Sequence, residues 1–85
     1  MTFTVVWRPT TQQRLAHIWN TDSHRAAVTG AANAIDAALK RDPLGHGESR
    51  GGTTRIFIHQ PLAVYYDVSE PDRLVTVWHV WRYPP

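Results

Sequence analysis

The chain has 85 residues, a hydrophobic fraction of 42%, a formal net charge of +2 and no cysteine. This length predicts one domain over residues 1–85, and the cysteine count excludes a disulfide scaffold and a thiolate metal site. No apolar run is long enough to cross a bilayer and the first residues do not form a secretion signal, so we expect a cytoplasmic protein with no membrane partner.

The first half of the chain predicts a strand followed by two helices. Residues 3–8 have the alternation of a strand, and Pro9 ends it because proline has no N–H to donate. A first helix is expected over about residues 9–20, and Asp22 or Ser23 is expected to cap a second one. Apolar residues of the second helix recur at helical spacing: Val28, Ala31, Ala32, Ile35 and Leu39. The short connection predicts a helical hairpin, with Gly30 either a weak point or a site of close helix contact.

The second half predicts a sheet. Residues 42–52 contain four glycines without periodicity and are expected to form a loop, which lacks the spacing of a phosphate-binding motif. Three strands follow, over residues 53–59, 62–68 and 73–83, with proline-containing turns between them that favour an antiparallel meander. The predicted fold is a two-layer α+β structure of order β-α-α-β-β-β. In it, the N-terminal helical hairpin packs on one face of a mostly antiparallel four-stranded sheet.

The strand over residues 53–59 carries the first candidate functional residues. Its alternation places Arg55, Phe57 and His59 on one side and Ile56 and Ile58 on the other. We expect the isoleucines to face the core and the first three residues to lie on the open face of the sheet. A cation, an aromatic ring and an imidazole are typical of a surface that binds single-stranded nucleic acid, and they are equally compatible with a solvated sheet face.

The last predicted strand, over residues 73–83, carries the second set of candidate functional residues. His79, Arg82 and Tyr83 interrupt an otherwise apolar run. Alternation places His79, Trp81 and Tyr83 on one side, and Arg82 on the other unless the strand bends or bulges near Pro84. The other histidines have no spacing typical of metal ligands, so we expect no metal site.

Several local phrases occur in an order that is typical of one family: Val5-Val-Trp-Arg-Pro before the first helix, Leu39 to Gly47, Arg55-Ile-Phe-Ile, Val64-Tyr-Tyr-Asp-Val, and Leu74 to Arg82. Over nearly its whole length the chain thereby resembles the RelE/ParE superfamily of toxins from bacterial type II toxin–antitoxin systems. The resemblance implies a cognate antitoxin as partner.

We expect this chain to follow the RelE branch, which implies an endoribonuclease that cuts mRNA on the ribosome without a metal or other cofactor. Such an enzyme activates the ribose 2′-hydroxyl, so it needs a proton acceptor, a proton donor and cations that hold the developing charge. The residues that could supply these groups are Arg55, His59, His79, Arg82 and Tyr83. Substrate contacts would come from Arg50, Phe57 and Trp81.

The ParE branch implies a different activity. Active nucleases of the superfamily often carry an arginine near the position of Ala63 and further polar residues where this chain has Pro84-Pro85. ParE-like toxins lack the nuclease set and are associated with inhibition of DNA gyrase through protein contacts, for which Trp78 or Trp81 would be anchors. The sequence is also compatible with a member that binds only its antitoxin and with an α+β domain that has no toxin activity.

Overall fold

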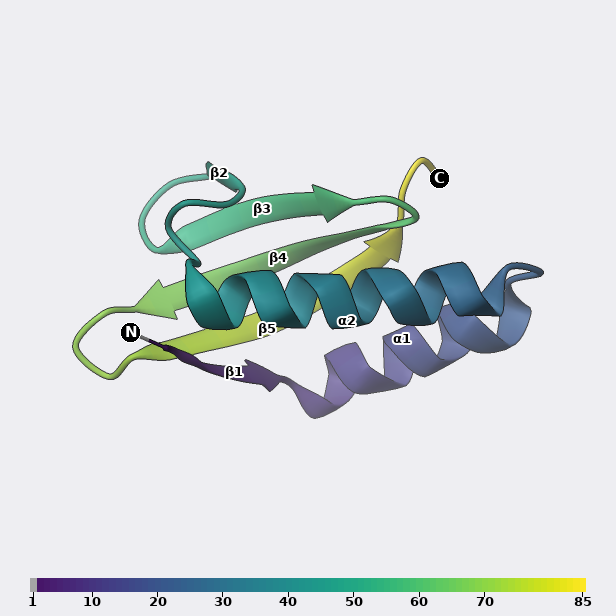
Figure 1. Ribbon diagram of the computed structural model, residues 1–85, viewed down its shortest axis with the longest axis horizontal. Helices are drawn as coiled ribbons and strands as arrows, with labels where there is room; N and C mark the ends of the chain where they lie inside the picture. Colours follow the sequence, from purple (N-terminus) through teal and green to yellow (C-terminus); the bar gives the residue numbers. More distant parts are fainter. Residues whose placement is uncertain (1) are drawn as a thin grey trace.

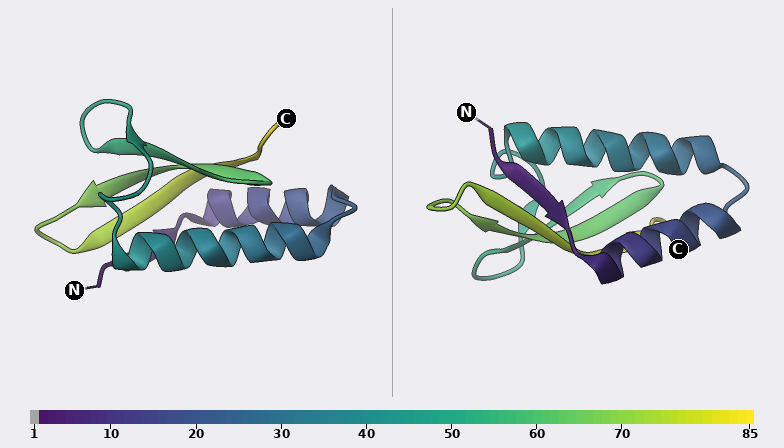
Figure 2. Two further views of the ribbon diagram at one scale, coloured as in Figure 1. Left: turned by 45° about the horizontal axis from the view of Figure 1, so that its top comes forward. Right: turned by 90° about the horizontal axis from the view of Figure 1, so that it is seen from below.

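Two helices lie against one face of a five-stranded sheet in the computed structural model, which describes residues 2–85 (Figure 1). In chain order the elements are β1 Thr4–Trp7, α1 Pro9–Thr21, α2 Arg25–Arg41, β2 Glu48–Ser49, β3 Thr54–His59, β4 Leu62–Ser69 and β5 Leu74–Arg82. The strands lie side by side in the order β1-β5-β4-β3-β2. Both helices cover the same side of the sheet (Figure 2), which confirms the predicted two-layer α+β architecture.

The sheet has one strand more than the sequence predicted. β3, β4 and β5 form the expected antiparallel meander, and β1 pairs in parallel with β5. The additional strand is β2, which pairs antiparallel with β3 inside the segment predicted as a loop. The prediction of four strands is therefore wrong. Its physical reason is that Glu48 and Ser49 are exposed and have no hydrophobic periodicity, so only their backbone pairing with β3 makes them a strand.

The helices agree with the sequence prediction except at the start of α2. α1 begins at Pro9, whose fixed φ and missing N–H suit the first helical turn. The residue before α2 is His24 rather than Asp22 or Ser23, and no side chain caps this end of the helix. Asp22 instead accepts the backbone N–H of His24 and forms an ion pair with Arg82 on β5. A residue expected to stabilise one helix thus connects the helical hairpin to the sheet.

The hydrophobic core lies between the helices and the sheet. Its buried residues are Ile18, Val28, Ala31, Ile35, Leu39, Leu62, Val64, Tyr66, Val68, Val75, Val77 and Val80. Alternate residues of β4 supply four of them, so one face of this central strand is fully buried. Over residues 2–85, no helix is both long and apolar enough to span a bilayer.

The predicted orientation of β3 is wrong. Arg55 lies opposite Tyr66 and Phe57 opposite Val64, and cross-strand partners share a face, so these residues face the helices. Phe57 packs against the core. Ile58 is 41% exposed on the open face. The error arose because we expected aliphatic residues to take the core face. The helices cover the centre of the sheet more than they cover β3, so Phe57 alone fills the core on the helix side of this strand.

Candidate functional site

Four aromatic side chains form a contiguous group on the open face of the sheet, away from the helices. This aromatic cluster consists of Tyr65, Trp78, His79 and Trp81. The ring centroids of Tyr65 and Trp78 are 5.2 Å apart with an interplanar angle of 12°. The ring centroids of Tyr65 and Trp81 are 4.9 Å apart, and those of His79 and Trp81 are 5.4 Å apart. These separations are those of stacked and tilted aromatic pairs, which hold one another in place.

A β-bulge in β5 brings Trp78 into the aromatic cluster. Tyr65 lies opposite His79 but Tyr66 lies opposite Val77, so Trp78 has no partner on β4. A bulge of this kind redirects a side chain, and here it places two consecutive residues beside Tyr65. Strict alternation would place Trp78 and His79 on opposite faces, and the bulge brings both to the open face. The signal in the sequence was the run of large aromatic residues after position 77, which cannot all alternate without leaving a Trp in the packed core.

The aromatic cluster is only half-buried, and aliphatic residues extend it toward β3. Ile56 lies opposite Tyr65, and Ile58 lies opposite Ala63, which in turn lies opposite Trp81. Ala63 is completely buried although it faces away from the helices, because the larger side chains around it cover it. The result is a mostly apolar surface that includes the polar atoms of His79 and Tyr65, whereas the indole nitrogen of Trp78 is buried.

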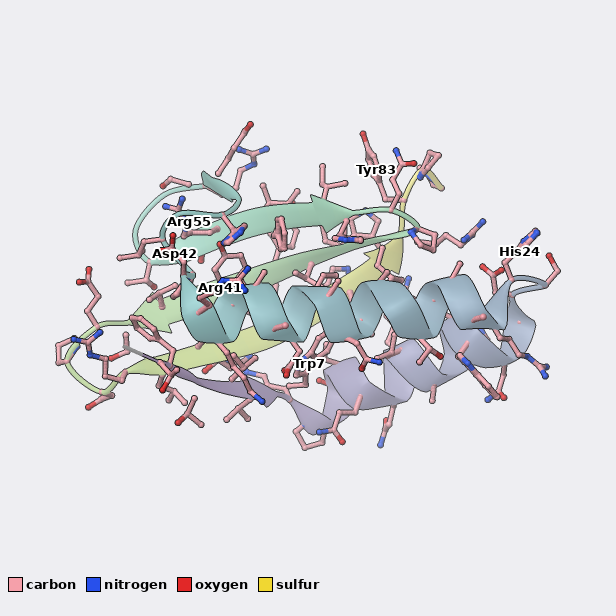
Figure 3. The ribbon with its side chains drawn as sticks, viewed as in Figure 1. Trp7, His24, Arg41, Asp42, Arg55 and Tyr83 are labelled. Atoms are coloured by element: carbon pink, nitrogen blue, oxygen red, sulfur yellow. The ribbon has the colours of Figure 1, made fainter. Side chains whose placement is uncertain are left out.

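Arg55, predicted as a catalytic cation, is held by a loop on the other side of the sheet. Its Nη2 donates to the carbonyls of Leu44, His46 and Gly47, each at 3.3 Å. Beside it, the buried Tyr66 hydroxyl donates to the carbonyls of Pro43 and His46 at 2.8 Å. Burial raises the pKa of Tyr66 above its ordinary value, although the neighbouring guanidinium acts in the opposite direction. Arg55 therefore stabilises the segment after α2 (Figure 3).

Three other predicted catalytic residues lie at the opposite end of the sheet. His59 and Arg82 lie on either side of Leu62 in one cross-strand row, on the face toward the helices. The Tyr83 N–H donates to the carbonyl of Pro61 at 2.8 Å, which places this residue at the turn between β3 and β4 (Figure 3). These three residues form what we call the terminal group.

The remaining candidates lie apart from the terminal group. His79 and Trp81 belong to the aromatic cluster, while Phe57 contacts His46 on the helix side, with ring centroids 5.4 Å apart. Arg50 is exposed and pairs with Glu48 at 3.2 Å. The predicted catalytic residues thus occupy three places: Arg55 under its loop, the terminal group, and His79 on the open face. Within the described part of the chain, no three His, Asp or Glu side chains are placed to share a metal ion.

A separate groove of about 670 Å³ lies between the two helices. Its walls are mainly apolar and include Leu15, Trp19, Val28 and Ala32. The indole N–H of Trp19 donates to Thr29 Oγ1 at 3.1 Å, so even the polar end of this side chain is satisfied within the groove. An apolar groove of this composition suits contact with hydrophobic side chains more than acid–base chemistry.

No protein-family model and no curated protein sequence matches this chain. Several chains of solved structures match it in fold, including two from toxin–antitoxin systems. A chain of the RelBE2 toxin–antitoxin complex from Mycobacterium tuberculosis matches with a TM-score of 0.78 and 18% identity, over 96% of this chain and 99% of that one. A chain of the chromosomal ParDE toxin–antitoxin system from P. aeruginosa matches with a TM-score of 0.74 and 13% identity, over 95% and 96%. The chain therefore shares its fold with chains of the RelBE2 complex and the ParDE system.

Proposed function

We propose that this chain is the toxin of a bacterial toxin–antitoxin pair and that it inhibits growth by binding a protein target through the open face of its sheet. The fold shared with chains of the RelBE2 and ParDE systems supports the first part. The aromatic cluster supports the second, because Trp and Tyr side chains on a firm, half-buried surface are typical anchors of protein interfaces.

The distribution of charge favours a protein target over RNA on this face. Arg55 and Arg82, which would have neutralised phosphates, lie on the helix side of the sheet. The open face instead carries Asp67 and Glu48, which lie in cross-strand register with Thr54 and Ile56. Glu48 is paired with Arg50, so Asp67 supplies the negative charge of this face. Carboxylates repel a phosphate backbone, so this face suits RNA poorly.

DNA gyrase is the protein target suggested by the ParE branch, and a cognate antitoxin is the second partner in the proposal. The apolar groove between α1 and α2 is a candidate surface for the antitoxin, because it offers hydrophobic walls at a distance from the open face.

The second candidate function is cleavage of mRNA on the ribosome at the terminal group. It is favoured by the position of His59, Arg82 and Tyr83 at the end of the sheet where β3 turns into β4. An imidazole and a phenol could exchange protons with a ribose, and the guanidinium could hold a phosphate. The Arg82 guanidinium forms an ion pair with Asp22 at 2.7 Å, and this carboxylate would compete with a phosphate for the same cation.

Inducible expression of the chain in bacteria tests the two functions. If the chain acts by binding a protein, we expect Tyr65→Ala and Trp81→Ala to abolish growth inhibition. The His59→Ala and Tyr83→Phe variants should still inhibit growth. Messages stay intact, and DNA damage appears if gyrase is the target. Codon-positioned cuts in translated messages that depend on His59 would instead support the nuclease and contradict the primary proposal. Gln13→Ala, an exposed change on α1, is the matched control, and circular dichroism checks that each variant is folded.

A further inference from the structure

One carboxylate lies on the open face directly beside the aromatic cluster. Asp67 follows Tyr65 by two positions on β4, so both side chains point the same way, about 6.6–6.8 Å apart along the strand. Across the sheet Asp67 lies opposite Thr54 and Thr76. The Thr54 hydroxyl donates to Asp67 Oδ1 at 2.7 Å, which fixes the position of the carboxylate. Among the residues that the structure describes, no basic side chain forms an ion pair with Asp67.

Asp67 lines a shallow cavity of about 380 Å³ at the end of the sheet formed by the turn between β4 and β5. Apolar atoms of Leu74 and Pro71 form part of its wall, and the polar part includes Thr76 and Glu70. A long basic side chain has the complementary composition, because its methylene stem can pack on apolar atoms while its charged head reaches an oxygen acceptor. The cavity and the aromatic cluster therefore form one continuous strip along the open face of β4 and β5.

We propose that this strip binds an extended segment of a partner protein that places a Lys or Arg side chain in the Asp67 cavity and apolar side chains on the aromatic cluster. The inference rests on the proposed function, in which the open face binds a protein, and it specifies the chemistry of that protein. Charge complementarity selects the basic residue. In an extended segment, residues two positions apart lie on one side at the same spacing as Asp67 and Tyr65. The recognised pattern is thus a basic residue and an apolar residue separated by one position.

Synthetic peptides test this pattern on the intact chain. The probe is a blocked nonapeptide, Gly-Thr-Arg-Thr-Leu-Thr-Trp-Thr-Gly, used together with its reverse sequence because the direction of binding is open. The matched peptides carry Glu in place of Arg. We expect the better Arg peptide to bind about tenfold more tightly than its Glu counterpart, measured by NMR titration. Asp67→Asn should bring that ratio below about twofold, and Tyr65→Ala should weaken both peptides.

Asp72→Asn is the matched control, because it removes one negative charge from the neighbouring turn without changing the cavity lining. An equal effect of Asp67→Asn and Asp72→Asn would show that only net charge matters and would overturn the proposal. Equal binding of the Arg and Glu peptides, no binding of either Arg peptide at about 1 mM, or tighter binding of a uridine decamer would overturn it as well.

Growth assays separate failure of this inference from failure of the proposed function. If Tyr65→Ala abolishes growth inhibition while Asp67→Asn leaves it unchanged, the open face acts without a basic segment. The inference then fails and the proposed function stands. If growth inhibition survives Tyr65→Ala and Trp81→Ala, both fail.

Discussion

Arg82 at the end of β5 and Asp22 in the turn between the helices form an ion pair, with Nη1 and Oδ2 2.7 Å apart. The Asp22 side chain is only 5% exposed, whereas that of Arg82 is 46% exposed. The other Asp22 oxygen accepts the backbone N–H of His24 at 2.7 Å. One carboxylate therefore connects the tip of the helical hairpin to the end of the sheet, where no strand pairing joins these two layers.

Replacing Asp22 by Asn should destabilise the fold by about 1–2 kcal/mol, because the charge is removed while the side chain keeps an oxygen for the His24 N–H. The half-exposed guanidinium regains water, which keeps the cost below that of a fully buried pair. Urea unfolding with an unchanged slope would measure the difference.

The control for this pair is a double-mutant cycle with Arg82→Ala. We expect the two changes together to cost less than the sum of the single changes by about 0.5–1 kcal/mol, which is the coupling of a partly exposed ion pair. Strict additivity would mean that the two residues stabilise the fold independently.

Hydrophobic periodicity was sufficient to predict the layers and most elements of this fold. The helical spacing of Val28, Ile35 and Leu39 identified α2, and all three residues are buried. β2 could not be predicted, because Glu48 and Ser49 contribute only backbone pairing to the sheet. The local sequence was thus sufficient to predict the elements that contribute buried residues to the core. It was not sufficient to predict β2, which contributes none.

The candidate site was less predictable, because strand faces depend on register and on which part of the sheet the helices cover. Alternation alone could not show that Phe57 rather than Ile58 would face the helices. The bulge at Trp78 shifted the faces of β5 by one residue before its end. The shared face of His59 and Arg82 depended on the orientation of β3, because alternation had already placed Arg82 on the face opposite His79.

The Tyr66 hydroxyl stabilises the segment after α2, and its removal should be costly. Tyr66→Phe keeps the ring in the core but removes the hydroxyl that lies 2.8 Å from the carbonyls of Pro43 and His46. The His46 carbonyl keeps Arg55 as a donor and the Pro43 carbonyl loses this hydrogen bond, so we expect a loss of about 1–2 kcal/mol. Faster amide hydrogen exchange around His46, with unchanged exchange in α1, would place the effect in this segment. Tyr65→Phe, which removes a hydroxyl from the open face, is the matched control and should change the free energy of unfolding by less than about 0.5 kcal/mol. If Tyr65→Phe lost as much stability as Tyr66→Phe, the effect could not be assigned to the hydrogen bonds of the Tyr66 hydroxyl.

The raised pKa of Tyr66 predicts a loss of stability in alkaline solution. Its ordinary value is 10.0, and burial raises it in the folded state. The folded chain therefore keeps the proton that the unfolded chain releases. The contribution of this group is fully present below pH 10.0 and is lost as the pH rises through the folded-state pKa. Between about pH 10 and about pH 11 the free energy of unfolding should fall more in the parent chain than in Tyr66→Phe. Urea titrations at both pH values measure this difference, and parallel declines in the two proteins would contradict it.

Two glycine-to-alanine changes should have opposite effects on stability. A Cβ at Gly30, within α2, would meet no atom within 4 Å, so this glycine is a weak point of the helix and not a site of close contact. Gly30→Ala should stabilise the chain by about 0.5–1 kcal/mol, because alanine loses less backbone entropy in a helix.

Gly47 has a φ of +71°, and a Cβ there would collide with the Ile56 carbonyl and approach the Tyr66 hydroxyl. Gly47→Ala should cost about 2–3 kcal/mol, from the strained backbone and the displaced segment. Thermal unfolding of both variants would check the signs, and a Gly47→Ala protein as stable as the parent would mean that residues 42–47 can separate from β3 without loss.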